Sequence, residues 1–251
     1  MEKKIIEIIG PPGVGKSSIY KSLCQDWNAK KNWIYQDALL APKKPSFVTF
    51  TRWLEYKTQV LLGKKLAKAL PVENGLRFVG NHEQLGAFCW HHLSNPTFFT
   101  DQESGKRFRA AYFLFLDFCR YQAIQDKSYD GPCLIDEGFL QKSFLIHDDQ
   151  QVMKDLIPQY LSLIPLPYAV IYIDTPDKHI IKERLHNRRK GGHSSVARNE
   201  DVLVAETARW QDLLQMVLDT IGEKVTVYKI DGAKPIRENV AVINNFLTNI
   251  R

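Results

Sequence analysis

The sequence predicts an α/β fold of three layers, in which helices cover both faces of a parallel β-sheet. Two observations favour this class. Strand-like and helix-like segments alternate along much of the chain, as in βαβ units. The first strand-like segment also runs into a glycine-rich turn that a helical pattern follows. With 251 residues, 44% of them apolar, the chain is expected to form one domain, residues 1–251.

The first predicted strand is the isoleucine-rich run at residues 5–9, which stops at a glycine. The next eight residues, Gly10 to Ser17, read GPPGVGKS and match the phosphate-binding motif GxxxxGK[ST]. From Lys16 onward, apolar residues fall at helical spacing, so a helix begins inside the motif. Strand, motif and helix therefore agree with one another, which makes a chance glycine-rich turn a poor explanation.

This arrangement suits a polyphosphate. Glycines let successive backbone N–H groups face one anion, and the helix dipole adds positive charge at the same place. We expect ATP and Mg²⁺ here, with Lys16 reaching the β- and γ-phosphates as a catalytic residue and the Ser17 hydroxyl binding the metal. The expected nucleotide-binding residues are Gly10, Pro11, Gly13, Val14, Gly15, Lys16, Ser17 and Ser18.

A second strand is predicted at residues 32–36, and Asp37 follows it. A carboxylate at this place can accept the proton of an attacking hydroxyl if it lies within hydrogen-bond reach. An aspartate can equally cap the turn that comes next. The sequence leaves both roles open, and Asp37 is a candidate catalytic base.

Residues from about 38 to 130 have little strand character and read as a helical insertion. Helical patterns cover 47–70, 82–93 and 104–127, with Pro71 and Gly75 as breakers after the first of them. The last of these helices is expected to pack through one stripe of side chains, formed by Phe108, Tyr112, Phe115 and Cys119.

Three further strands are predicted, at 132–136, 168–174 and 224–230, with helices at 199–221 and 235–250. Asp136 ends the first of these strands. Ligands of open parallel sheets bind beyond the carboxyl ends of the strands, and an unpaired buried carboxylate is costly. Asp136 is therefore a candidate catalytic residue and metal ligand, with Glu137 beside it.

A basic segment follows the fourth strand and reads ERLHNRRKGGHSSVAR. Arg184 and Arg188 stand four residues apart, so on a helix both guanidinium groups leave the same face and can hold one phosphate. The hypothesis is an arginine-rich lid at about residues 184–199, in which both arginines are catalytic. The alternative is a solvated basic helix end.

Four pieces of the chain resemble the thymidylate kinase and deoxynucleoside kinase-like group of P-loop kinases. They are GPPGVGKS, LIDEGF, IYIDTPDKHIIKERLHNRRKGG and VYKIDGAKPIRENV. The resemblance implies a P-loop NTPase fold with about five parallel strands and ATP-dependent phosphoryl transfer to a nucleoside or nucleotide. The group has an arginine after the acidic residue of the second piece, whereas this chain has Glu137. Because of that difference, a carbohydrate-type acceptor is an alternative to a nucleoside or nucleotide acceptor.

Candidate acceptor-binding residues are Arg109 and Arg120 in the insertion, and Glu137. Both arginines share a helix that leads into the Asp136 strand. Asp117, three residues before Arg120, could instead pair with it in a surface interaction.

Two function classes remain. The first is an ATP-dependent small-molecule kinase acting on a hydroxyl or phosphate, and the second is a regulatory NTPase that hydrolyses ATP or GTP to drive a conformational change. A glutamate directly after Asp136 keeps the second open. No GTPase NKxD motif is present in the sequence.

The composition and charge of the chain limit which partners and which cellular location we expect for the protein. No apolar stretch is long enough to span a bilayer, and the chain starts directly with strand and loop, so we expect a cytoplasmic protein without a membrane partner. The net charge of +6 gathers in the basic segment rather than on an aromatic-rich basic face, which argues against nucleic acid. The sequence leaves open whether the protein forms a homodimer. Four cysteines without metal-ligand spacing are expected to be reduced.

Overall fold

The computed structural model describes residues 3–41, 48, 50–61, 70–94, 104–147, 150–190 and 200–250. Five strands form one sheet in the order β2-β3-β1-β4-β5, and every neighbouring pair is parallel. The strands are β1 (Ile5–Ile9), β2 (Ile34–Tyr35), β3 (Cys133–Asp136), β4 (Ala169–Asp174) and β5 (Thr226–Asp231). The predicted α/β class and five-stranded sheet are confirmed.

Strand β1 lies at the centre of the sheet, and its side chains alternate between the two faces. Ile5 and Ile9 belong to one apolar cluster, whereas Ile6 and Ile8 belong to the other. All five residues of β1 are buried, as expected for a parallel strand covered on both sides.

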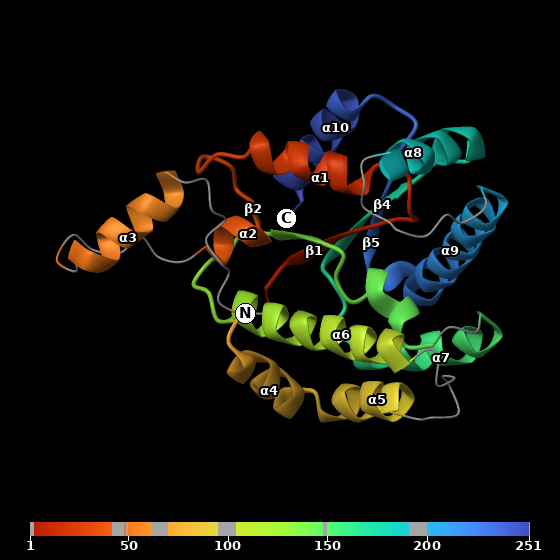
Figure 1. The fold of residues 1–251 in the computed structure, drawn as a ribbon, viewed down its shortest axis with the longest axis horizontal. Helices are drawn as coiled ribbons and strands as arrows, with labels where there is room; N and C mark the ends of the chain where they lie inside the picture. Colours follow the sequence, from red (N-terminus) through yellow and green to blue (C-terminus); the bar gives the residue numbers. More distant parts are fainter. Residues whose placement is uncertain are drawn as a thin grey trace.

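Helices cover each face of the sheet (Figure 1). One face carries α1 (Lys16–Gln25), α8 (Lys178–Lys190) and α10 (Ile236–Asn249). The other face carries α6 (Ser104–Gln125), α7 (Gln150–Leu163) and α9 (Glu200–Ile221). Two 3-10 helices lie in the described part of the chain, η3 (Gln141–Leu145) and η4 (Gly222–Lys224).

The insertion forms a further group of helices after β2. It contains α2 (Gln36–Leu39), α3 (Phe50–Leu61), α4 (Val72–Asn81), α5 (Glu83–Ser94) and α6. Helices α4 and α5 pack against the outer side of α6 (Figure 1). Strand β2 is shorter than predicted because Gln36 already begins α2.

Gly75 was expected to break the helical pattern, and this prediction is wrong. Gly75 lies inside α4 and is buried, because α4 crosses α6 closely at this point. A Cβ atom on Gly75 would stand 2.6 Å from Cζ of Phe115 and 2.7 Å from Sγ of Cys119. The glycine therefore permits close helix packing. Of the predicted helix at 47–70, residues 62–69 lie outside the described residues.

The predicted packing stripe of α6 is also wrong in its first half. Phe108 is 79% exposed and Tyr112 is 60% exposed, although Cys119 is buried. The buried face instead contains Ala110, Leu114, Asp117, Phe118 and Tyr121. The buried face could not be recognised as an apolar stripe in the sequence because it includes Asp117.

Of the described helices, none combines the length and the apolar character that crossing a membrane requires. The four cysteines all lie in the described part of the chain, and none of them forms a disulfide there.

Candidate active site

The loop between β1 and α1 has the conformation of a phosphate-binding loop. Gly10, Gly13 and Gly15 all have positive φ, at 157°, 86° and 99°. A Cβ atom on Gly10 would stand 2.1 Å from the carbonyl oxygen of Ile173, so this position accepts glycine only. Gly15 precedes α1, and no side chain caps the helix, which leaves its first N–H groups available to an anion.

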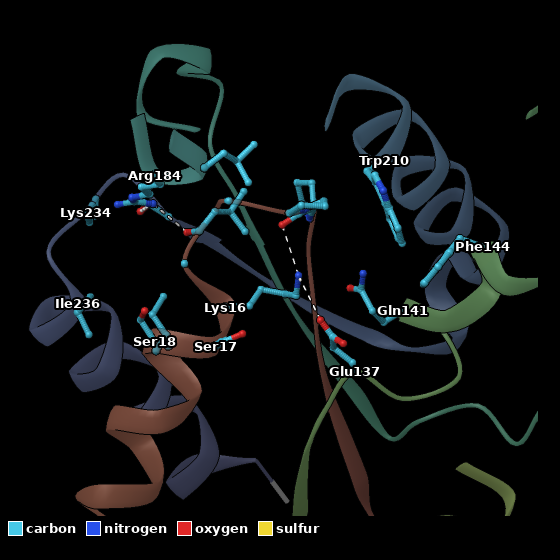
Figure 2. Close-up of a pocket in the computed structure, with 18 residues that line it drawn as sticks. Lys16, Ser17, Ser18, Glu137, Gln141, Phe144, Arg184, Trp210, Lys234 and Ile236 are labelled. Atoms are coloured by element: carbon cyan, nitrogen blue, oxygen red, sulfur yellow. Dashed lines mark hydrogen bonds and ion pairs between the residues drawn. The ribbon is translucent and has the colours of Figure 1, made fainter. Parts of the chain in front are cut away.

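Lys16 is buried at the start of α1 and bends back over the loop. Its Nζ donates to the carbonyl oxygens of Gly10 at 2.6 Å and Pro11 at 3.3 Å. The same ammonium lies 3.7 Å from Oε1 of Glu137. The lysine therefore joins the loop from β1 to the turn that follows β3 (Figure 2).

Two acidic residues stand at the carboxyl end of β3. Asp136 pairs in register with Ile8, which places it next to the loop. Its Oδ1 is buried and has no hydrogen-bond partner in the described part of the chain. Burial, together with the charge of Glu137, raises the pKa of Asp136 to about 6, and Lys16 opposes that rise. Glu137 adopts φ of 57°, which non-glycine residues seldom do.

A pocket of about 620 Å³ is lined by the loop, by Lys16 and by Glu137. Figure 2 shows Arg184, Lys234 and Ile236 on one side of Lys16, and Phe144 and Trp210 on the other. The lining includes all of the expected nucleotide-binding residues except Gly10. The pocket thus has a basic end, at Arg184 and Lys234, and an aromatic end, at Phe144 and Trp210, with the phosphate-type loop between the two ends.

Arg184 of α8 lies at the basic end and is held by backbone oxygens. Its Nη1 donates to Val14 at 3.0 Å and to Gly232 at 2.9 Å. Gly232 follows β5, so one guanidinium group joins α8, the phosphate-type loop and the β5 turn. A role of Arg184 in a lid stays a prediction. The side chain of Arg188 and residues 191–199 lie outside the described residues.

Arg120 is engaged in an ion pair that was expected only as an alternative and at the surface. Asp117 is fully buried, and its Oδ1 lies 2.9 Å from Nη1 of Arg120. Its Oδ2 lies 2.6 Å from Nζ of Lys142. The surface location is wrong, because this face of α6 packs against η3. Burial raises the pKa of Asp117, and the two cations oppose that rise.

Apart from Gly10, four of the expected site residues whose side chains the structure describes do not line the pocket, namely Asp37, Arg109, Arg120 and Asp136. Arg109 is exposed in the first half of α6 and does not line the pocket. Asp37 is half-buried in the first turn of α2 and does not line it either. Of the three acidic candidates, Glu137 is the one that does. Acceptor binding by Arg109 and proton transfer to Asp37 remain predictions.

Several pocket residues were missed in the sequence. Gln141 and Phe144 come from η3, Trp210 from α9, and Ile236 from the start of α10. Nothing in their local sequence distinguishes them, because only the sheet topology brings these elements together. The one local signal for Gln141 and Phe144 is their place in the short run FLQKSF, which follows the strand that ends at Asp136.

No family model matches the sequence, and no curated protein matches it. Among solved structures, the chain is similar to deoxyadenosine kinase from M. mycoides with the products dCMP and a flexible dCDP bound. That match has a TM-score of 0.51 and 15% identity, and it covers 98% of this chain and 100% of the other.

The same kinase with bound dATP gives a TM-score of 0.46 at 14% identity, with 96% and 98% of the chains covered. A gluconokinase from Sinorhizobium meliloti 1021 gives 0.35 at 16% identity, with 98% and 91% covered. At these identities the likeness concerns the fold. The chain has the fold of a deoxynucleoside kinase-like P-loop kinase, as the resemblance predicts.

Proposed function

We propose that this protein is an ATP-dependent small-molecule kinase that transfers the γ-phosphoryl group to a hydroxyl or phosphate acceptor. The proposed acceptor is a nucleoside, a nucleotide or a carbohydrate-type metabolite. One observation carries the proposal: the pocket extends beyond Lys16 in both directions, which gives room for a nucleotide on one side and a second molecule on the other. The whole chain is proposed to work as one kinase domain.

ATP is proposed to bind between the basic end of the pocket and the phosphate-type loop. The N–H groups of the loop and the start of α1 would hold its phosphates, and Lys16 would exchange its loop carbonyls for phosphate oxygens. Arg184 keeps Val14 and Gly232 together, so it would maintain the shape of the basic end.

The residues present fit Mg²⁺. The Ser17 hydroxyl is exposed in the pocket, and the buried Oδ1 of Asp136 is an orphaned oxygen next to the loop. Within the described ranges no three His, Cys, Asp or Glu side chains cluster to form a closed site. This agrees with Mg²⁺, which protein groups hold through few ligands plus waters and phosphates. When bound, the ion would neutralise charge on the phosphates.

Glu137 is the proposed acceptor-side carboxylate. It lines the pocket and faces Lys16 at 3.7 Å, whereas Asp37 does not line it. A carboxylate at that place can accept a hydrogen bond from an acceptor hydroxyl and then its proton. The same position can orient water, so nucleotide hydrolysis by a regulatory NTPase is the second candidate.

Mg²⁺-dependent ATP consumption, measured across pools of nucleosides, nucleoside monophosphates and sugars, tests the proposal. Strong stimulation by one acceptor that disappears in Lys16→Ala supports a kinase and gives its substrate class. Steady hydrolysis that no acceptor changes would favour the regulatory NTPase.

A further inference from the structure

Gln141 is an uncharged side chain that is 3% exposed and lines the pocket. Its Oε1 accepts the backbone N–H of Gly10 at 2.8 Å. Gly10 is the first residue of the phosphate-type loop, and its own carbonyl oxygen accepts from Lys16. Gln141 therefore holds the first residue of the loop, and the carbonyl oxygen of that residue accepts a hydrogen bond from Lys16.

This hydrogen bond also fixes the orientation of the amide. Only the oxygen of a glutamine side chain can accept from a backbone N–H, so the Nε2 of Gln141 must lie on the other side. Nε2 makes no hydrogen bond to any residue that the structure describes. Nε2 is not among the buried polar atoms that lack a partner in the described part of the chain, so it is open to the pocket that Gln141 lines. Its two N–H groups can therefore donate to an oxygen of a molecule inside the pocket.

The surroundings of Gln141 indicate which molecule this is. The rings of Phe144 and Trp210 pack edge to face, with centroids 4.2 Å apart, and both residues are half-buried walls of the pocket. Figure 2 shows Gln141 between this pair and Lys16. Among the residues that the structure describes, the cations that line the pocket besides Lys16 are Arg184 and Lys234, at the opposite end. The aromatic end suits an uncharged ring that carries oxygen atoms.

We propose that Gln141 couples the two halves of the site: its Oε1 holds the loop at Gly10, while its Nε2 donates to an oxygen of an uncharged ring-bearing acceptor that packs against Phe144 and Trp210. This rests on the proposed kinase function and deepens it. Gln141 is then both a positioning residue for the nucleotide and a specificity residue for the acceptor.

The proposal is tested by calorimetric titration with MgADP and, in saturating MgADP, with 2′-deoxyadenosine, D-glucose and D-gluconate as probes. Wild-type protein is expected to bind an uncharged probe more tightly than gluconate. Gln141→Met should weaken that probe about tenfold and also weaken MgADP several-fold. Trp210→Leu should weaken the probe similarly and leave MgADP within about twofold. Gln215→Met, the same change at an exposed position of α9, is the control and should alter neither.

The MgADP titration and the probe titration of Gln141→Met together distinguish a purely structural role of Gln141 from the proposed role. Loss of MgADP binding in Gln141→Met with unchanged probe binding would overturn the acceptor contact, and so would absence of binding by every probe to wild-type protein. Unchanged MgADP binding would overturn the link to the loop. The kinase function itself fails on a different result, namely ATP consumption that no acceptor stimulates. If Gln141→Met does not fold, the Trp210→Leu titration decides the acceptor subsite.

Discussion

The backbone N–H of Leu140 donates to Oε2 of Glu7 at 3.1 Å, and this bond ties the central strand to the turn that carries Glu137 and Gln141. Glu7 is a fully buried carboxylate in the middle of β1. Tyr121 of α6 donates to its other oxygen. A Cβ atom on Gly138 would stand 2.5 Å from the Glu7 carboxyl carbon, so the turn lies directly on this group.

Burial raises the pKa of Glu7 to about 7, well above its ordinary value of 4.5, and the hydrogen bonds from Tyr121 and Leu140 limit the rise. Between these pH values the folded protein binds more protons than the unfolded chain, so this group makes folding less favourable as pH increases from 4.5 to 7.

Glu7→Gln removes that charge. We therefore expect the free energy of unfolding of this variant, relative to wild type, to increase by roughly 2 to 3 kcal/mol between pH 5 and pH 8. Urea unfolding at both pH values measures it. Glu83→Gln, at an exposed position of α5, is the matched control. A difference between Glu7→Gln and wild type that does not change with pH would contradict the account.

Gly75→Ala should destabilise the protein by about 1 to 3 kcal/mol, because the added methyl group overpacks the contact of α4 with Phe115 and Cys119. Gly80→Ala is the control in the same helix, since no atom of the described residues lies within 4 Å of its Cβ position. It should be neutral or stabilising by up to about 1 kcal/mol. Thermal unfolding of the two variants compares them directly, and equal effects would argue against close packing at Gly75.

Arg184→Ala should raise the KM for ATP about tenfold, because hydrogen bonds from a charged group to the Val14 and Gly232 carbonyls are lost and each 1.4 kcal/mol is a factor of ten. Arg237→Ala, at an exposed position of α10, removes the same charge outside the pocket lining. Initial rates over a range of ATP concentrations measure the effect. A KM that both variants raise equally would indicate a general effect of charge.

Asp117→Asn should reduce the free energy of unfolding by about 3 kcal/mol, since it leaves Arg120 and Lys142 without their buried counter-charge. Asp126→Asn removes one partner of the exposed pair with Arg77 and should change stability by less than about 1 kcal/mol. Denaturant unfolding of both variants provides the comparison. Similar small effects would show that the Asp117 cluster contributes little.

The features that could be predicted from the sequence are those written in local patterns. The strand at residues 5–9 is apolar throughout, and the glycines after it are needed for a loop that side chains would block. The final strand and helix were also predicted to within two residues. The phosphate-type loop, Lys16 and Asp136 could be predicted because each stands at the carboxyl end of a recognisable strand.

The remainder depends on tertiary contacts that no local pattern records. Helix α7 was not predicted, since Pro158 in its interior reads as a helix breaker. Asp117 looked like a surface residue because its two cations come from different elements, α6 and η3. Gln141 and Trp210 are far apart in the chain and meet at the pocket because η3 follows β3 and α9 precedes β5, and both strands belong to one sheet.

The central claim is that phosphoryl groups pass from ATP to a second molecule held beyond Lys16. The most direct test follows the label of γ-³²P-ATP after incubation with Mg²⁺ and the acceptor pools, separating organic products from inorganic phosphate by chromatography. The account predicts label in one organic product with wild-type protein and none with Lys16→Ala. Label that appears only in inorganic phosphate, whichever acceptor is present, would contradict it.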